Sequence, residues 1–107
     1  MAFTKKNIEL NSDNYLVIEI NETEIGLTNM SDLRNETDSA ILSGEKNIVL
    51  DLKSVNVINS SGLGVLIGIL KKVKTEGGKF ALSNTNEKLM NIFKITKLNL
   101  VFDFINL

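Results

Sequence analysis

The order of apolar and polar positions along the chain predicts several short strands. Phe3 to Leu10 alternates in part between apolar and polar side chains, and Tyr15 to Ile20 is an almost continuous apolar run. The turn-forming sequence Asn11 to Asn14 lies between them, so the two segments are expected to pair as an antiparallel hairpin. Three further apolar runs have the length of buried strands, at residues 48–52, 79–83 and 100–105.

Three other segments carry apolar residues at helical spacing and are predicted to form amphipathic helices. The first spans about residues 30–41 after the cap candidates Thr28 and Asn29, the second spans about 60–76, and the third follows the capping sequence 84–86. Glycines lie where the first two helices are expected to end. The predicted order of elements is therefore β-β-α-β-α-β-α-β.

This order defines a fold class. Strand-helix-strand connections pair strands in parallel, through a right-handed crossover, whereas the initial hairpin is antiparallel. Each amphipathic helix needs a sheet face to cover, and so few connections bring the helices mainly to one side. The sequence predicts a single α/β domain over residues 1–107, with a small mixed, mostly parallel β-sheet and amphipathic helices packed mainly on one face.

Composition excludes several classes of function. A net charge of -1 provides no concentrated basic surface for nucleic acid or for direct membrane binding. The absence of cysteine and histidine rules out disulfides, thiolate chemistry and a Ser-His-Asp triad, and leaves only carboxylates as metal ligands. No signal peptide or long apolar span is present, so a cytoplasmic protein without cofactor or metal is expected.

The remaining acidic and glycine residues do not indicate an enzyme. Asp51 lies within a predicted strand and has no catalytic partner in view, so it is interpreted as supporting a loop or a helix end through hydrogen bonds. Gly62, Gly64 and Gly68 suggest a dinucleotide-binding loop, but their spacing is one residue longer than that fingerprint. The chain also has room for only half of a dinucleotide-binding fold.

The start of the second predicted helix is the strongest candidate site. Ser60, Ser61 and Gly62 follow the strand 48–52 and lie where backbone N–H groups are unpaired and the helix dipole is positive. One interpretation is that Ser60 or Ser61 simply caps the helix. The other is that a serine here accepts a phosphate, since the same N–H groups stabilise an anion. The spacing by itself favours the cap.

One flank of this helix also indicates a docking surface. Val65 and Ile69 are expected to turn away from the sheet at about 100° per residue. Gly64 and Gly68 lie one turn apart on another flank, where no side chain blocks close approach. These residues either form an apolar strip for a partner or are covered by a neighbouring helix, and both interpretations stay open.

Three segments form a recognisable combination: residues 47–52 (NIVLDL), 57–66 (VINSSGLGVL) and 76–82 (EGGKFAL). Together they resemble the STAS domain and, more narrowly, the stand-alone bacterial anti-sigma factor antagonists. The resemblance covers nearly the whole chain in its order of elements. It implies a small mixed sheet with helices mainly on one face, in agreement with the pattern above.

The resemblance also implies a function and its residues. It implies a non-enzymatic partner-switching protein that binds an anti-sigma factor, itself a serine kinase, and so controls sigma-factor-dependent transcription. Phosphorylation of the first serine of the motif, Ser60 here and alternatively Ser61, would switch binding off, and a phosphatase would restore it. The residues expected to contact the partner are Thr23, Glu24, Gly26, Asn59, Ser61, Gly62, Gly64, Val65, Gly68 and Ile69.

Two positions depart from the family pattern. The family has aspartate before the acceptor serine, where this chain has Asn59, and aspartate in the loop after the second strand, where this chain has Gly26. An amide keeps its hydrogen bonds but loses the charge and the capacity to act as a base. The missing acids fit an alternative within the same family, a constitutive STAS subunit of a lipid-transporting ABC system.

Overall fold

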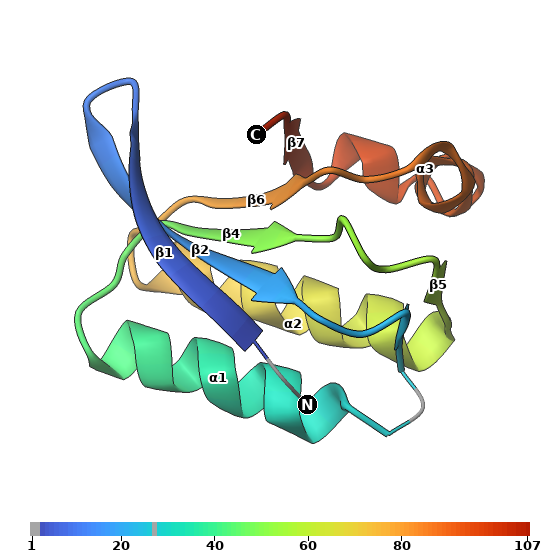
Figure 1. Ribbon diagram of the computed structural model, residues 1–107, viewed down its shortest axis with the longest axis horizontal. Helices are drawn as coiled ribbons and strands as arrows, with labels where there is room; N and C mark the ends of the chain where they lie inside the picture. The colour runs from blue at the N-terminus through green and yellow to red at the C-terminus, as the bar shows by residue number, and fades with distance from the viewer. Residues whose placement is uncertain (1–2, 27) are drawn as a thin grey trace.

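A five-stranded sheet forms the centre of the molecule, in the order β1 Phe3–Leu10, β2 Asp13–Ile20, β4 Ile48–Asp51, β6 Phe80–Ser83 and β7 Asp103–Ile105 (Figure 1). The computed structural model describes residues 3–26 and 28–107. β1 and β2 are antiparallel, whereas the pairs β2–β4, β4–β6 and β6–β7 are parallel. The predicted hairpin and the mostly parallel sheet are therefore confirmed.

The β1–β2 hairpin turns through two residues, Asn11 and Ser12. Both have positive φ angles, of 52° and 71°. A two-residue turn with left-handed backbone matches the twist of the flanking strands. The pairing runs in register from Phe3 opposite Ile20 to Leu10 opposite Asp13, so each β2 side chain lies on the same face of the sheet as that of its β1 partner.

The helices cover mainly one face of the sheet, as predicted. They are α1 Met30–Leu42, α2 Ser60–Thr75 and α3 Glu87–Ile95, and a 3₁₀ turn, η1 Leu98–Leu100, follows α3. α1 and α2 lie side by side beneath the sheet, and α3 lies beyond the end of β6 (Figure 1). Buried side chains of all three helices belong to one hydrophobic cluster with alternate residues of the strands. No helix in the described ranges is long and apolar enough to cross a bilayer.

The opposite face of the sheet carries a smaller apolar cluster. Val17, Val49 and Ala81 are buried there, with Ile8, Tyr15 and Ile105 packed around them. The strands β2, β4 and β6 therefore bury side chains on both faces, which explains why they are nearly continuous apolar runs in the sequence.

The last strand is shorter than predicted. The predicted strand began at Leu100, but Leu100 is the last residue of η1 and β7 begins only at Asp103. Phe102 is buried, with its ring centroid 6.2 Å from that of Phe80 and 5.7 Å from that of Phe93. Because this ring packs into the core, the strand predicted over residues 100–105 does not form along its whole length. The apolar composition of the segment could not indicate where the strand would begin.

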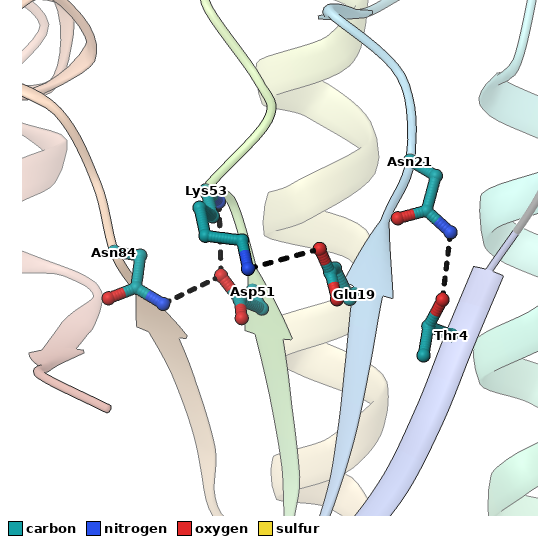
Figure 2. A network of polar contacts seen from close by, with 6 residues as sticks. All are labelled: Thr4, Glu19, Asn21, Asp51, Lys53 and Asn84. Atoms are coloured by element: carbon teal, nitrogen blue, oxygen red, sulfur yellow. Dashed lines mark hydrogen bonds and ion pairs between the residues drawn. The ribbon is translucent and has the colours of Figure 1, made fainter.

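Asp51 supports two loops at the carboxyl end of β4, as its interpretation from the sequence proposed. The residue is only 6% exposed, and its Oδ1 accepts hydrogen bonds from the Lys53 N–H at 3.0 Å and from Asn84 Nδ2 at 2.9 Å (Figure 2). Lys53 Nζ lies 3.7 Å from Glu19 Oε2 on the neighbouring strand. The carboxylate therefore ties the segment after β4 to the segment after β6.

A second, two-stranded sheet was not predicted. It pairs β3 Glu24–Ile25 in parallel with β5 Val57–Ile58, with Glu24 opposite Val57 and Ile25 opposite Ile58. Two-residue strands carry no detectable periodicity, so the pairing has no signal in the sequence. Its effect is to hold the segment before α1 against the segment that leads into α2.

Candidate functional site

α2 begins at Ser60 and is capped by the residue before it. Asn59 has extended backbone, and its Oδ1 accepts a hydrogen bond from the Gly62 N–H at 2.8 Å. The expectation that Ser60 or Ser61 caps the helix is wrong, because the cap position falls one residue earlier. Both serines instead lie in the exposed first turn of the helix. The cap therefore leaves their side chains at the surface.

The β3–β5 pair brings the loop after β2 to the start of α2. The Asn56 N–H donates to the Thr23 carbonyl at 2.7 Å, and the Asn59 N–H donates to the Ile25 carbonyl at 3.2 Å. Thr23 is exposed, Glu24 is half-buried and Gly26 is buried beside Asn59. These four predicted site residues, Thr23, Glu24, Gly26 and Asn59, are thus brought together at one end of the molecule.

The Asn59 side chain packs so closely against Gly26 that its position requires glycine there. Gly26 has φ +127°, and a Cβ atom placed on it would lie 1.8 Å from Asn59 Oδ1. Any side chain at position 26 would therefore displace the cap of α2 and strain the backbone. An aspartate at position 26 is incompatible with this arrangement of Asn59, so the two departures from the family pattern form one structural unit.

Asn29 is a positioning residue that the sequence pattern assigned to a different role. It occupies the N-cap position of α1, but its side chain makes no capping bond to that helix. Its Oδ1 accepts from the Gly26 N–H at 3.1 Å, and its Nδ2 donates to the Glu24 carbonyl at 2.6 Å. The buried amide thereby fixes the loop that faces Asn59. No feature of the sequence distinguishes this role from ordinary capping.

The predicted apolar docking strip is wrong, and the alternative of a covering helix is correct. Val65 and Ile69 are 2% and 4% exposed. α1 packs against α2, and a shallow groove of about 220 Å³ between them is lined by Arg34, Thr37, Asp38, Ile41, Gly68, Ile69 and Lys72. An apolar flank of α2 is buried because it faces a second helix in addition to the sheet.

The glycine flank of α2 remains open. Gly64 and Gly68 are both exposed, and a Cβ atom at either position would meet nothing within 4 Å. Gly62 differs, because its Cβ would lie 2.4 Å from the Ile25 carbonyl oxygen. Gly62 is therefore needed for close approach of α2 to β3, whereas Gly64 and Gly68 leave a smooth surface next to the two serines.

The start of α2 contributes no charged side chain of its own to this site. No charged residue occurs between Lys53 and Lys71, so the first turn of α2 presents N–H groups and the positive end of the helix dipole without a side-chain cation. In the part of the chain that the structure describes, no three acidic residues come together as a metal site. The arrangement can present a neutral hydroxyl to a partner and can accommodate an anion at the same position.

The cap at Asn59 gives a measurable prediction. Asn59→Ala is expected to lower the free energy of unfolding by about 1 kcal/mol, because the Gly62 N–H loses its acceptor. Asn59→Asp is the matched control and should stay within a few tenths of a kcal/mol of the wild type, because a carboxylate also caps a helix and favours its positive end. Urea unfolding followed by circular dichroism measures both. Equal stability of the alanine variant and the wild type would contradict the capping role.

Comparison with known proteins places this geometry in a family. The model of the STAS domain matches residues 6–106. The anti-sigma-B factor antagonist of Bacillus subtilis is 44% identical over 52 residues, which are 49% of this chain and 48% of that protein. The chain spans about half the length of the first curated relatives it matches, between 48% and 55%.

Solved structures show the same fold. A putative anti-sigma factor antagonist from Thermotoga maritima has a TM-score of 0.76 at 27% identity, over 95% of this chain and 84% of that one. The anti-sigma factor antagonist SpoIIAA in its unphosphorylated form has a TM-score of 0.75 at 20% identity, over 99% and 88%. Its phosphorylated form, described as a Bacillus cell fate determinant, has a TM-score of 0.69 at 20% identity, over 99% and 91%. Since the family model covers nearly all of the sequence and the fold agrees, this chain belongs to the STAS domain family.

Proposed function

We propose that this protein is an anti-sigma factor antagonist that binds an anti-sigma factor through the start of α2 and releases it when Ser60 is phosphorylated. The observation that carries the proposal is the exposed, uncharged first turn of α2, which lies between the β3–β5 pair and the glycine flank Gly64 and Gly68. The name of the Bacillus subtilis relative and the two phosphorylation states of SpoIIAA support this function.

A phosphoryl group at Ser60 would act on the partner more than on the fold. A serine kinase would transfer the γ-phosphoryl group of ATP to Ser60 Oγ, with release of ADP and of the hydroxyl proton, and a phosphatase would hydrolyse the ester. The product adds nearly two negative charges and three oxygen atoms, which the N–H groups of the helix start can accommodate. A partner surface fitted to a neutral hydroxyl loses its contacts, so binding is lost while the domain stays folded.

Asn59 affects how the phosphoryl transfer would proceed. Its amide is already engaged as the helix cap and cannot accept a proton as a carboxylate could. The base that takes the Ser60 proton would therefore come from the kinase. The residues that this chain contributes therefore only position the acceptor Ser60. Asn59 and Gly62 fix the helix start, and Thr23, Glu24 and Gly26 lie beside it.

Substitution of Ser60 tests the proposal. Ser60→Glu is expected to weaken binding to the purified cognate anti-sigma factor by about 100-fold, or ~2.7 kcal/mol, because a charge meets a surface fitted to a hydroxyl. Isothermal titration calorimetry measures the affinity. Ser60→Ala should keep the affinity and abolish phosphate incorporation from ATP, and Ser61→Glu is the neighbouring control with a smaller effect. Unchanged affinity of Ser60→Glu would contradict the switch.

The neutral pair of Asn59 and Gly26 favours a second candidate in the same family. A constitutive STAS subunit of a lipid-transporting ABC system would hold a nucleotide-binding subunit without needing acidic neighbours or phosphorylation. For such a subunit, affinity for the transporter ATPase would be the same before and after treatment with a phosphatase, and mass spectrometry of protein from the native cell would find Ser60 unmodified. Phosphate at Ser60 in the native protein would exclude this candidate.

A further inference from the structure

Three exposed apolar side chains lie at the end of α3 and in the turn that follows it. Ile95 and Leu100 are each 82% exposed, and Val101 is 46% exposed. We call these three residues, with the neighbouring Lys94 and Lys97, the α3–η1 patch. Three large apolar side chains within seven residues of sequence are more than the single exposed hydrophobic residues that are normal on a protein surface.

The core does not need these side chains. α3 buries Leu89 and Phe93 completely, and the Phe93 ring contacts those of Phe102 and Phe104 at centroid distances of 5.7 and 5.4 Å. At about 100° per residue, Ile95 lies nearly opposite Phe93 on the helix. Ile95 therefore lies on the solvent face of α3, on the same side as Lys88 two turns earlier. Its exposure follows from this position on the helix and is not a packing defect.

Local hydrogen bonds hold the patch in one shape. The Lys97 N–H donates to the Lys94 carbonyl at 3.1 Å, the Leu100 N–H donates to the Lys97 carbonyl at 3.3 Å, and the Val101 N–H donates to the Leu98 carbonyl at 3.0 Å. The buried Phe102 fixes the chain immediately after the patch. A surface that is already ordered loses little conformational entropy when it binds.

The charges around the patch indicate what would cover it. Residues 87–103 contain three lysines, Lys88, Lys94 and Lys97, and one acidic residue at each end of the segment, Glu87 and Asp103, so the segment is net positive although the whole chain has a net charge of -1. All three lysines are exposed, and the lysine ion pairs of the described residues involve Lys5, Lys53, Lys72 and Lys79 instead. Lys94 also lies in the last turn of α3, where a cation complements the dipole but is not neutralised by it.

We propose that the α3–η1 patch is a docking surface for an acidic segment of another protein that carries apolar side chains. Carboxylates on that segment would pair with Lys94 and Lys97, while its apolar side chains would cover Ile95 and Leu100. A membrane fits less well, because a helix that lies in a bilayer surface needs an apolar face along its length, and the apolar face of α3 is turned into the core.

The patch is separate from the start of α2. Asn86, the cap of α3, donates hydrogen bonds to the Val55 carbonyl at 3.3 Å and to Asn56 Oδ1 at 3.2 Å, so this end of α3 lies beside β5. Ile95 is nine residues further along the helix, which places it roughly 13 Å away along the axis. The inference therefore does not depend on the proposed switch at Ser60.

A defined peptide tests the inference. The probe is a synthetic helical peptide of about 16 residues with leucines at helical spacing and glutamates elsewhere, titrated into the ¹⁵N-labelled full chain. Amide shifts are expected at residues 88 and 94–101, with affinity that falls as salt rises. Combining Ile95→Ser and Leu100→Ser should raise Kd by about tenfold or more. Leu42→Ser, at another highly exposed leucine, is the matched control and should leave Kd unchanged.

Other outcomes would overturn the inference. Equal binding of a peptide with lysine in place of every glutamate would show that charge is not recognised. Shifts centred on the start of α2, or a Kd insensitive to Ile95→Ser and Leu100→Ser, would place the contact elsewhere. Binding to phosphatidylglycerol vesicles without binding to the acidic peptide would show that the patch is a lipid contact instead of a protein contact.

Discussion

Val65→Asp is expected to leave the protein largely unfolded. Val65 is 2% exposed and belongs to the main hydrophobic cluster, on the flank of α2 one turn before Ile69, which lines the groove with α1. A short carboxylate at this position cannot reach water, and the loss of apolar burial adds to the cost of the charge. The expected destabilisation is about 4 kcal/mol or more, against a typical total of ~5–15 kcal/mol.

Gly64→Asp provides the control for this experiment. The new side chain is the same and the position is adjacent, but Gly64 is exposed and open space surrounds its Cβ. A carboxylate near the start of a helix is also favoured by the dipole, so the variant should remain as stable as the wild type. Far-UV circular dichroism and urea unfolding measure both variants. A folded Val65→Asp protein with unchanged stability would mean that Val65 is not part of the buried core.

Gly62→Ala is expected to destabilise the protein by about 2 kcal/mol or more, although alanine is the better helix former. The added Cβ would lie 2.4 Å from the Ile25 carbonyl oxygen and 3.0 Å from Ile58 Cγ2. Neither neighbour can move easily, because β3 and β5 are paired and the same Ile25 carbonyl accepts from the Asn59 N–H. The clash therefore separates α2 from the small sheet.

Gly64→Ala should have the opposite sign. Its Cβ meets nothing within 4 Å, so the substitution is expected to stabilise the helix by ~0.5–1 kcal/mol through propensity alone. Urea unfolding of the two alanine variants, two positions apart in one helix, separates close packing from helix propensity. If both variants gained stability, the close approach of α2 to β3 would be disproved.

Most of the fold could be predicted from local patterns in the sequence. The alternation in 3–10, the apolar runs at 15–20 and 48–52, and the helical spacing in 60–76 each depend on neighbouring residues only. These patterns predicted the antiparallel hairpin, the parallel crossovers and helices mainly on one face, all of which the structure has. The capping role of Asn86 was also predictable, because a cap acts within one turn of its helix.

The candidate site was only partly predictable. The pattern located the exposed start of α2 and the smooth flank formed by Gly64 and Gly68. It assigned the cap to a serine one position too late, because asparagine and serine cap equally well and a shift of one residue leaves the helical periodicity unchanged. The supporting bonds of Asn29 to the loop before α1 had no sequence signal at all.

The sequence by itself determined the strands of the main sheet, the three helices, their order and the glycines that keep α2 open on one flank, because these properties follow from local backbone preference and from the spacing of apolar residues. Only the tertiary structure decided which surfaces stay exposed. It paired β3 with β5, packed Gly26 against Asn59, buried Val65 and placed α1 beside Ile69. Each of these contacts joins residues far apart in the chain, so its energy depends on a geometry that no local pattern contains.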